Sequence, residues 1–146
     1  MVTVQRHPES ELRMPAAKLR GISQLSDALG ALESIEGSMK EVGRFFTHVD
    51  TMRCATVPEV PAEMVCAVAN VTAKSIIAAR ALLEVPSFVG TLELFNLGAE
   101  VADLFDPKTP RHSKGRLFEF NELDSHVAEL RTQVERSLVT LKSIER

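Results

Sequence analysis

Over residues 120–144, apolar side chains return at alternating steps of three and four. These positions form a heptad seam, made of Phe120, Leu123, Val127, Leu130, Val134, Ser137, Leu141 and Ile144. Only Ser137 is polar, and the residues between the seam positions are mostly charged or polar. The pattern predicts a long helix with coiled-coil-like packing. Because ordering each residue costs about 1–2 kcal/mol of backbone entropy, the seam needs a partner, in this chain or in another.

The same three-and-four spacing predicts three earlier helices, over residues 16–52, 61–85 and 87–105. Two prolines in the connector 56–61 separate the first predicted helix from the second, and the pair Asp106-Pro107 separates the third from the last. Proline cannot continue a helix. Residues 1–13 are polar and predict an N-terminal tail, and Pro15 suits the first turn of the helix that follows. We therefore expect one all-α domain over residues 14–146, an antiparallel four-helix bundle whose C-terminal helix is coiled-coil-like.

The first predicted helix contains several glycines, each costing about 1 kcal/mol against alanine. They are Gly21, Gly30, Gly37 and Gly43. Two interpretations stay open at this point: the glycines allow close helix approach or a bend, or they mark a weak, surface-facing stretch.

The second and third predicted helices are more apolar than a lone bundle requires. At 100° per residue, the polar residues of the second helix fall within an arc of about 120°. They are Glu63, Asn70, Lys74, Arg80 and Glu84. Those of the third helix, Glu93, Asn96, Glu100 and Asp103, fall within about 80°. Since a bundle helix hides only part of its circumference, we expect the surplus to be covered in a homo-oligomer or a larger assembly.

Composition places the chain among ordinary globular proteins, with 146 residues, 45% apolar and 25% charged. The net charge of −3 gives no general electrostatic case for nucleic acid or an anionic membrane. Cys54 and Cys66 predict unpaired thiols in a reducing compartment, with Cys66 buried and inert in an apolar run. The N-terminus has no apolar core of a secretion signal, so the expected location is the cytoplasm.

The longest apolar run, residues 64–85, contains Asn70, Lys74 and Arg80. A lysine at the centre of a bilayer costs about 2.5–3.5 kcal/mol. The run therefore predicts a buried helix of a soluble protein and no membrane span.

The connector before the last helix is basic and carries Lys108, Arg111, Lys114 and Arg116 beside His112. One hypothesis is anion binding by these four residues, to phosphate or to an acidic partner. The favoured alternative is a solvated loop whose positive charge lies near a helix C-terminus, where the helix dipole stabilises it. No aromatic residue interleaves with these charges, so nucleic acid is a weaker candidate partner than protein.

The sequence offers little for catalysis, since it has no phosphate-binding glycine loop, no nucleophile elbow and no paired metal-ligand motif. We therefore expect no enzyme, no metal and no cofactor. The preferred hypothesis is a non-catalytic interaction or assembly module, a scaffold, adaptor or structural subunit. Its predicted partner interface comprises Phe120, Leu123, Val127, Leu130, Val134, Leu141 and Ile144. Two alternatives remain: an oligomer that contacts nucleic acid or phosphate through residues 108–116, and a ligand pocket among Met64, Phe88, Phe95 and Phe105.

Overall fold

The computed structural model describes the backbone of residues 2–52, 60–85, 91–106 and 113–143. Side chains are described for residues 18–52, 60–85, 93–106 and 115–143. Within these ranges the chain forms four helices and no strand: α1 (Val2–Thr51), α2 (Ala62–Leu83), α3 (Thr91–Asp103) and α4 (Ser113–Ser143). The predicted all-α class and the four predicted helices are confirmed.

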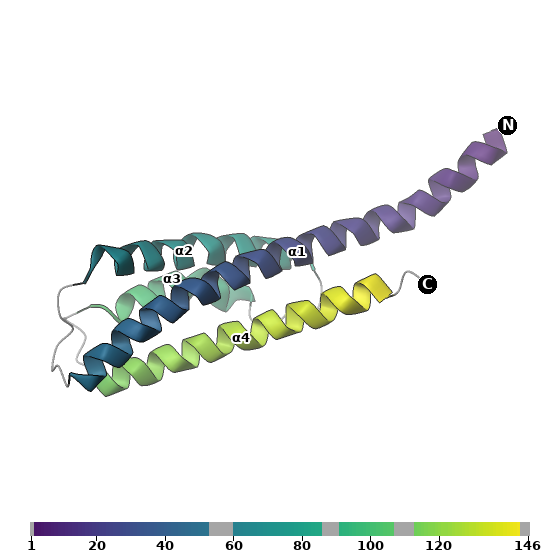
Figure 1. Ribbon diagram of the computed structural model, residues 1–146. Coiled ribbons are helices and arrows are strands. Elements are labelled where there is room, and N and C mark those ends of the chain that lie inside the picture. The colour runs from purple at the N-terminus through teal and green to yellow at the C-terminus, as the bar shows by residue number, and fades with distance from the viewer. Residues whose placement is uncertain (1, 53–59, 86–90, 107–112, 144–146) are drawn as a thin grey trace.

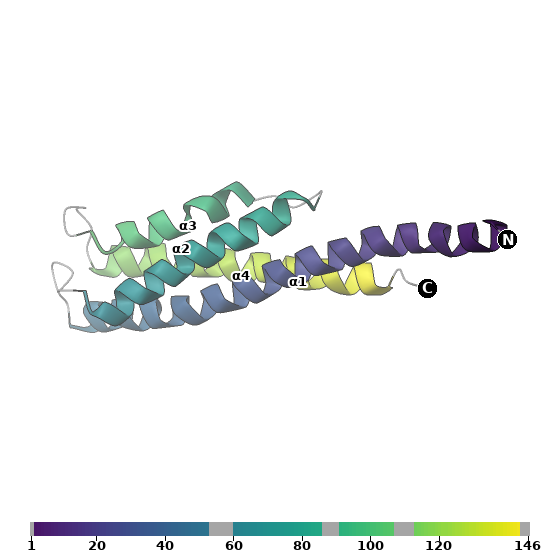
Figure 2. The same ribbon diagram turned by 90° about the horizontal axis from the view of Figure 1, so that it is seen from above.

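The helices reverse direction at each connection, so neighbours along the chain run antiparallel (Figure 1). α1 packs against α2 on one side and α4 on the other, and α2 packs against α3. α3 meets α4 at only a few points, as the view from above also indicates (Figure 2). α1 is therefore the central helix, and α3 is held chiefly by α2.

The heptad seam of α4 finds its packing partner within the chain. Phe120, Val127, Leu130 and Val134 are buried in the core, while Leu123, Ser137 and Leu141 are half-buried. Leu138, which lies outside the predicted seam, is also buried, and Ile144 lies outside the described residues. Across the same interface Arg131 of α4 forms a salt bridge with Glu36 of α1. The seam thus packs mainly on α1, and a contact of the seam with another chain stays a prediction.

Two of the four glycines of α1 allow the close approach of α4. A Cβ added at Gly21 would lie 3.0 Å from Leu141 Cδ2, and one at Gly43 would lie 2.8 Å from Phe120 Cε2. At Gly30 and Gly37, by contrast, an added Cβ meets nothing within 4 Å. The close-approach interpretation therefore holds for Gly21 and Gly43, and the surface interpretation holds for Gly30 and Gly37.

Substituting Gly37→Ala should stabilise the fold, because alanine is favoured over glycine inside a helix by about 1 kcal/mol. We expect Tm to rise by roughly 2–4 °C in thermal unfolding followed by circular dichroism. The matched variant is Gly43→Ala, in the same helix, where the added methyl group must displace the Phe120 ring. If Gly43→Ala were as stabilising as Gly37→Ala, the close packing of α1 on α4 would be contradicted.

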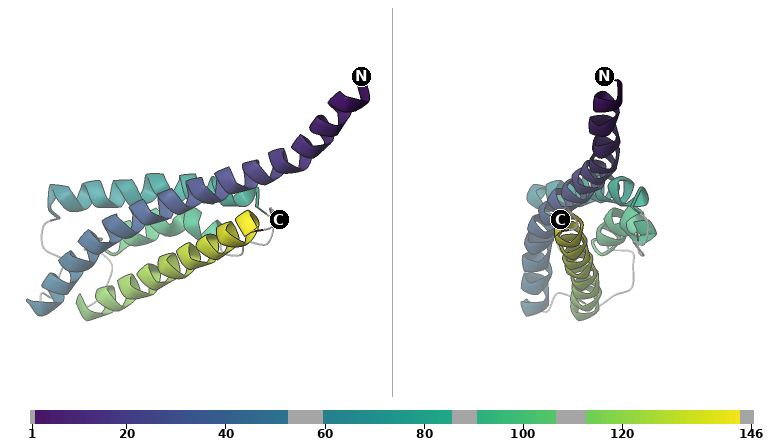
Figure 3. Two further views of the ribbon diagram at one scale, coloured as in Figure 1. Left: turned by 45° about the vertical axis from the view of Figure 1, so that its right-hand side comes forward. Right: turned by 90° about the vertical axis from the view of Figure 1, so that its right-hand side faces the viewer.

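Residues 2–13 of the predicted tail are helical, since α1 begins at Val2. Pro8 and Pro15 lie inside α1, although each removes one helical hydrogen bond. The N-terminal part of α1 leaves the bundle and extends well past its end, and α1 curves along its length (Figure 3). Residues 2–13 therefore form a projection of α1, where their polar composition had predicted an N-terminal tail.

Asp124 of α4 is half-buried, and desolvation raises the pKa of its carboxyl above the ordinary value of 3.8. A carboxyl whose pKa is raised by folding binds its proton more tightly in the folded state, so its ionisation opposes folding above that raised pKa. The opposing contribution disappears as the pH falls from the raised pKa towards 3.8.

We expect Asp124→Asn to stabilise the chain at neutral pH and to lose that advantage in acid. Urea unfolding of both proteins at several pH values measures the difference. Asp27→Asn makes the same charge change at an exposed position of α1 and is the matched control. An Asp124→Asn variant that is less stable than the parent at neutral pH would contradict the desolvation argument.

Candidate interaction surface

Residues of the polar arc of α2 form hydrogen bonds with the flank of α1. Asn70 donates hydrogen bonds to the hydroxyl oxygens of Ser38, at 2.8 Å, and Ser34, at 3.1 Å. Glu84 accepts a hydrogen bond from the side-chain amide of Gln24. Because these polar groups turn towards α1, a different and mostly apolar side of α2 faces outwards.

That apolar side continues onto α3 and makes a surface that we name the outer face. Its members share an exposed or half-buried position on the side of α2 or α3 that points away from the core. They are Val65, Ala69, Thr72 and Ile76 of α2 and Phe95, Ala99 and Ala102 of α3. Val65 is 59% exposed and Phe95 39% exposed. The predicted apolar surplus of the second and third helices therefore lies uncovered by this chain.

The two helices that carry the outer face lie unusually close together at Gly98. A Cβ added there would be 2.7 Å from the Cα of Thr72, a backbone atom that cannot give way. Only glycine allows this crossing, so the exposed side chains of α2 and α3 form one continuous surface. The alanines at positions 69, 99 and 102 have small side chains, so this surface protrudes less between Val65 and Phe95.

One edge of the outer face is acidic. Glu93, Asn96, Glu100 and Asp103 of α3 are all exposed, as predicted for the solvated side of this helix. We name this set the acidic ridge. Residues 91–106 contain four acidic residues and no lysine or arginine. A partner on the outer face would therefore meet apolar side chains in the middle and negative charge along the α3 side.

Two predictions for α2 change with this geometry. Cys66 is exposed, so the prediction of a buried, inert thiol was wrong; Cys54 lies outside the described residues. α2 is also the one described helix long and apolar enough to cross a membrane, and only 33% of its most apolar window is buried. Core helices of soluble proteins can have the same length and composition, so the expectation of no membrane span stays a prediction.

Of the predicted anion-binding set, only Arg116 has a described side chain. Arg116 is 2% exposed, and its guanidinium donates to the backbone carbonyls of Leu104 and Asp106, the latter at 3.1 Å. It therefore binds the C-terminal end of α3, where the helix dipole favours positive charge, but it is buried where the alternative had expected a solvated loop, and it is not a surface anion ligand. Lys108 and Arg111 lie outside the described residues. Lys114 belongs to the first turn of α4, because that helix begins at Ser113, earlier than predicted.

The three described members of the proposed internal ligand pocket differ in burial. Phe105 lies in an aromatic cluster of the core, with ring centroids 4.8 Å from Phe46 and 5.4 Å from Phe45, while Phe95 is exposed. Met64 is buried in the core, and Phe88 lies outside the described residues. Phe95 therefore contributes to the surface of the protein, where the sequence hypothesis had placed it inside.

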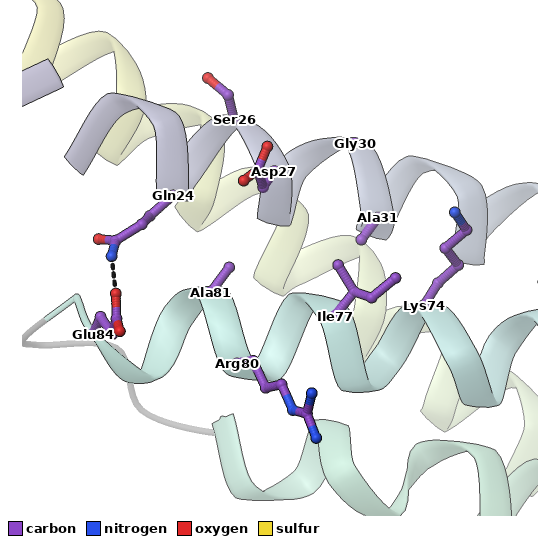
Figure 4. A pocket seen from close by; sticks show the side chains of 10 residues that line it. All are labelled: Gln24, Ser26, Asp27, Gly30, Ala31, Lys74, Ile77, Arg80, Ala81 and Glu84. Carbon is purple, nitrogen blue, oxygen red and sulfur yellow. Dashed lines mark hydrogen bonds between the residues drawn. The ribbon is translucent and has the colours of Figure 1, made fainter. Parts of the chain in front are cut away.

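An open groove of about 550 Å³ runs between α1 and α2 (Figure 4). Ala31, Ile77 and Ala81 lie along it, and Gln24 and Glu84 are hydrogen-bonded at one end. Its two basic residues, Lys74 and Arg80, are balanced by its two acidic residues, Asp27 and Glu84. With no net charge and a side open to solvent, the groove lacks the convergent polar groups of a small-molecule site.

In the ranges where side chains are described, no three His, Cys, Asp or Glu residues gather in a way that could hold a metal ion. Comparisons with protein families, curated proteins and solved structures give no match to this chain. We take the outer face as the candidate interaction surface among the described residues, and its function has to be inferred from its residues. One sequence signal could have located the outer face. It is the set of alanines near Val65 and Phe95 on the second and third helices, which carry the apolar excess.

Proposed function

We propose that the chain is a non-catalytic assembly module that packs a helix of a partner chain onto the outer face. The observation that carries this proposal is the exposure of Val65 and Phe95 on a continuous, largely apolar surface. Large apolar patches of soluble proteins mark interaction sites, because covering them removes apolar area from water at about 25 cal/mol per Å².

The texture of the outer face favours a helix as its ligand. The alanines and Thr72 have small side chains, and Val65, Ile76 and Phe95 have larger ones. Rows of larger side chains on one helix pack between those of another helix, and small residues allow the two helices to approach closely. An amphipathic helix that enters an apolar groove through residues three and four apart is a recurrent mode of protein recognition.

The proposal is tested by the native mass of the chain isolated from cells that produce it naturally. We expect a complex heavier than the 16.1 kDa single chain. The double variant Val65→Glu, Phe95→Glu should run at 16.1 kDa while keeping its helical circular dichroism, because both side chains are exposed.

The matched control is Val139→Glu, since Val139 is 67% exposed but lies on α4, away from the outer face. This variant should assemble as the parent does. A parent chain that runs at 16.1 kDa in the extract, or a complex that survives the double variant, would overturn the proposal.

A further inference from the structure

We propose that the C-terminal part of α1 and the start of α2 bind a small phosphorylated molecule that has an apolar body. The site consists of two adjoining hollows, which we name the basic hollow, on α1, and the end groove, between α1 and α2. The residues of the outer face line neither hollow, so this inference goes beyond the proposed function and does not depend on it.

The basic hollow is an open depression of about 610 Å³ on α1. The residues that line it are Lys40, Gly43, Arg44, Thr47 and His48. Three of these side chains are basic and none is acidic among the described residues, although the chain as a whole has a net charge of −3. The basic hollow therefore differs from the groove in Figure 4, whose acidic and basic residues balance.

The basic side chains of this hollow are available to a ligand. Lys40, Arg44 and His48 are exposed, and within the part of the chain that the structure describes their side chains form no hydrogen bond or ion pair. Lys40 and Arg44 are four residues apart on one face of α1, and like charges at this spacing destabilise a helix. An anion bound between them would relieve that repulsion.

A phosphate monoester suits these donors. Its three terminal oxygens accept hydrogen bonds and carry a charge of about −1.5 to −2 at neutral pH. Arg44 lies between Lys40 and His48 along the helix, and its planar fork of N–H groups matches the geometry of phosphate oxygens. Lys40 adds a compact positive charge beside it.

The end groove offers a place for an apolar body. Its volume is about 740 Å³, in the size range of small-molecule sites. Its apolar lining residues are Phe45, Pro61, Ala62 and Met64. Phe45 is held by ring contacts with Phe46 and Phe105. The groove also contains the carboxylates of Glu41 and Glu63, which would repel a phosphate placed there.

The two hollows share Arg44 and His48 as lining residues, so they are adjacent. At about 100° per residue, these side chains project between Thr47, which lines only the basic hollow, and Phe45, which lines only the end groove. A ligand bound across this boundary therefore places its phosphate in the basic hollow and its apolar body in the end groove.

The test measures the binding of 1-naphthyl phosphate to the full-length chain by isothermal titration calorimetry. Inorganic phosphate and 1-naphthol serve as partial ligands, one for each hollow. We expect 1-naphthyl phosphate to bind at least about 10-fold more tightly than either partial ligand, because only the complete molecule occupies both hollows at once.

Lys40→Gln, Arg44→Gln removes two positive charges of the basic hollow at exposed positions, so this variant should keep its helical circular dichroism. We expect it to bind 1-naphthyl phosphate at least about 10-fold more weakly, because charge-assisted hydrogen bonds to phosphate are lost. The matched control is Arg136→Gln, Lys142→Gln, which removes one arginine and one lysine at exposed positions near the C-terminal end of α4. The control should bind as the parent does.

Four results would overturn the inference. A parent chain that does not bind 1-naphthyl phosphate at millimolar concentration is the first, and a Lys40→Gln, Arg44→Gln variant that binds it as tightly as the parent is the second. Equal affinity for inorganic phosphate would show that the end groove contributes nothing. Equal affinity for 1-naphthol would show that the basic hollow contributes nothing.

Discussion

Replacing Val134 with aspartate is expected to unfold the chain. Val134 is 0% exposed in the seam between α4 and α1. A carboxylate there would be buried without a partner, and such substitutions cost more than about 4 kcal/mol, a large share of the roughly 5–15 kcal/mol that stabilises a whole domain. We expect loss of helical circular dichroism at 25 °C in a chain that no longer shows a cooperative thermal transition.

Val139→Asp is the control, because Val139 lies five residues further along the same helix and is 67% exposed. Its effect should stay within about 0.5 kcal/mol. A Val134→Asp variant that remains folded and merely loses assembly would show that the seam faces another chain. The intramolecular packing of α4 on α1 would then be wrong.

Replacing Arg116 with methionine is expected to produce the second-largest loss of stability. The guanidinium satisfies the carbonyls of Leu104 and Asp106, and each buried carbonyl left without a donor costs about 1–3 kcal/mol. Methionine keeps much of the side-chain volume, so the loss of stability measures the contribution of the hydrogen bonds. We expect a decrease of about 2–4 kcal/mol in the free energy of unfolding, or roughly 10 °C in Tm.

Arg116→Lys separates charge from geometry. It keeps the positive charge near the end of α3, but one ammonium group cannot reproduce the planar fork of a guanidinium. We expect it to recover only part of the lost stability in urea unfolding. Full recovery by lysine would mean that the charge alone matters. An unchanged Arg116→Met variant would mean that the end of α3 does not depend on this residue.

Periodicity was sufficient to predict the helices whose packing follows their apolar stripe. The C-terminal end of α1, both ends of α2 and the core positions of α4 agree with the pattern to within a few residues. The N-terminal part of α1 was not predicted, because residues 1–13 are polar and Pro15 suits the first turn of a helix. Leu138 was missed because a strict heptad chose Ser137, although a helix with 3.6 residues per turn drifts from that register.

The pattern of a single helix could not predict which of its sides faces solvent. The polar arc of α2 suggested its solvent side, yet Asn70 and Glu84 contact α1, and Cys66 is exposed as a result. The role of Arg116 was also hidden, because its acceptors are backbone carbonyls that carry no sequence signature. Both errors arise because polar side chains form hydrogen bonds with neighbouring helices as readily as with water.

The projection of α1 past the end of the bundle has a consequence for the size of any assembly built on it. The projecting part of α1, or arm, and any surface of a second copy that binds it are different parts of the chain, so a contact between them is heterologous. Two copies that exchange arms reciprocally close into a finite pair with no free arm left over. Copies that pass their arms onward, each to the next, instead build an open fibre whose length rises with protein concentration.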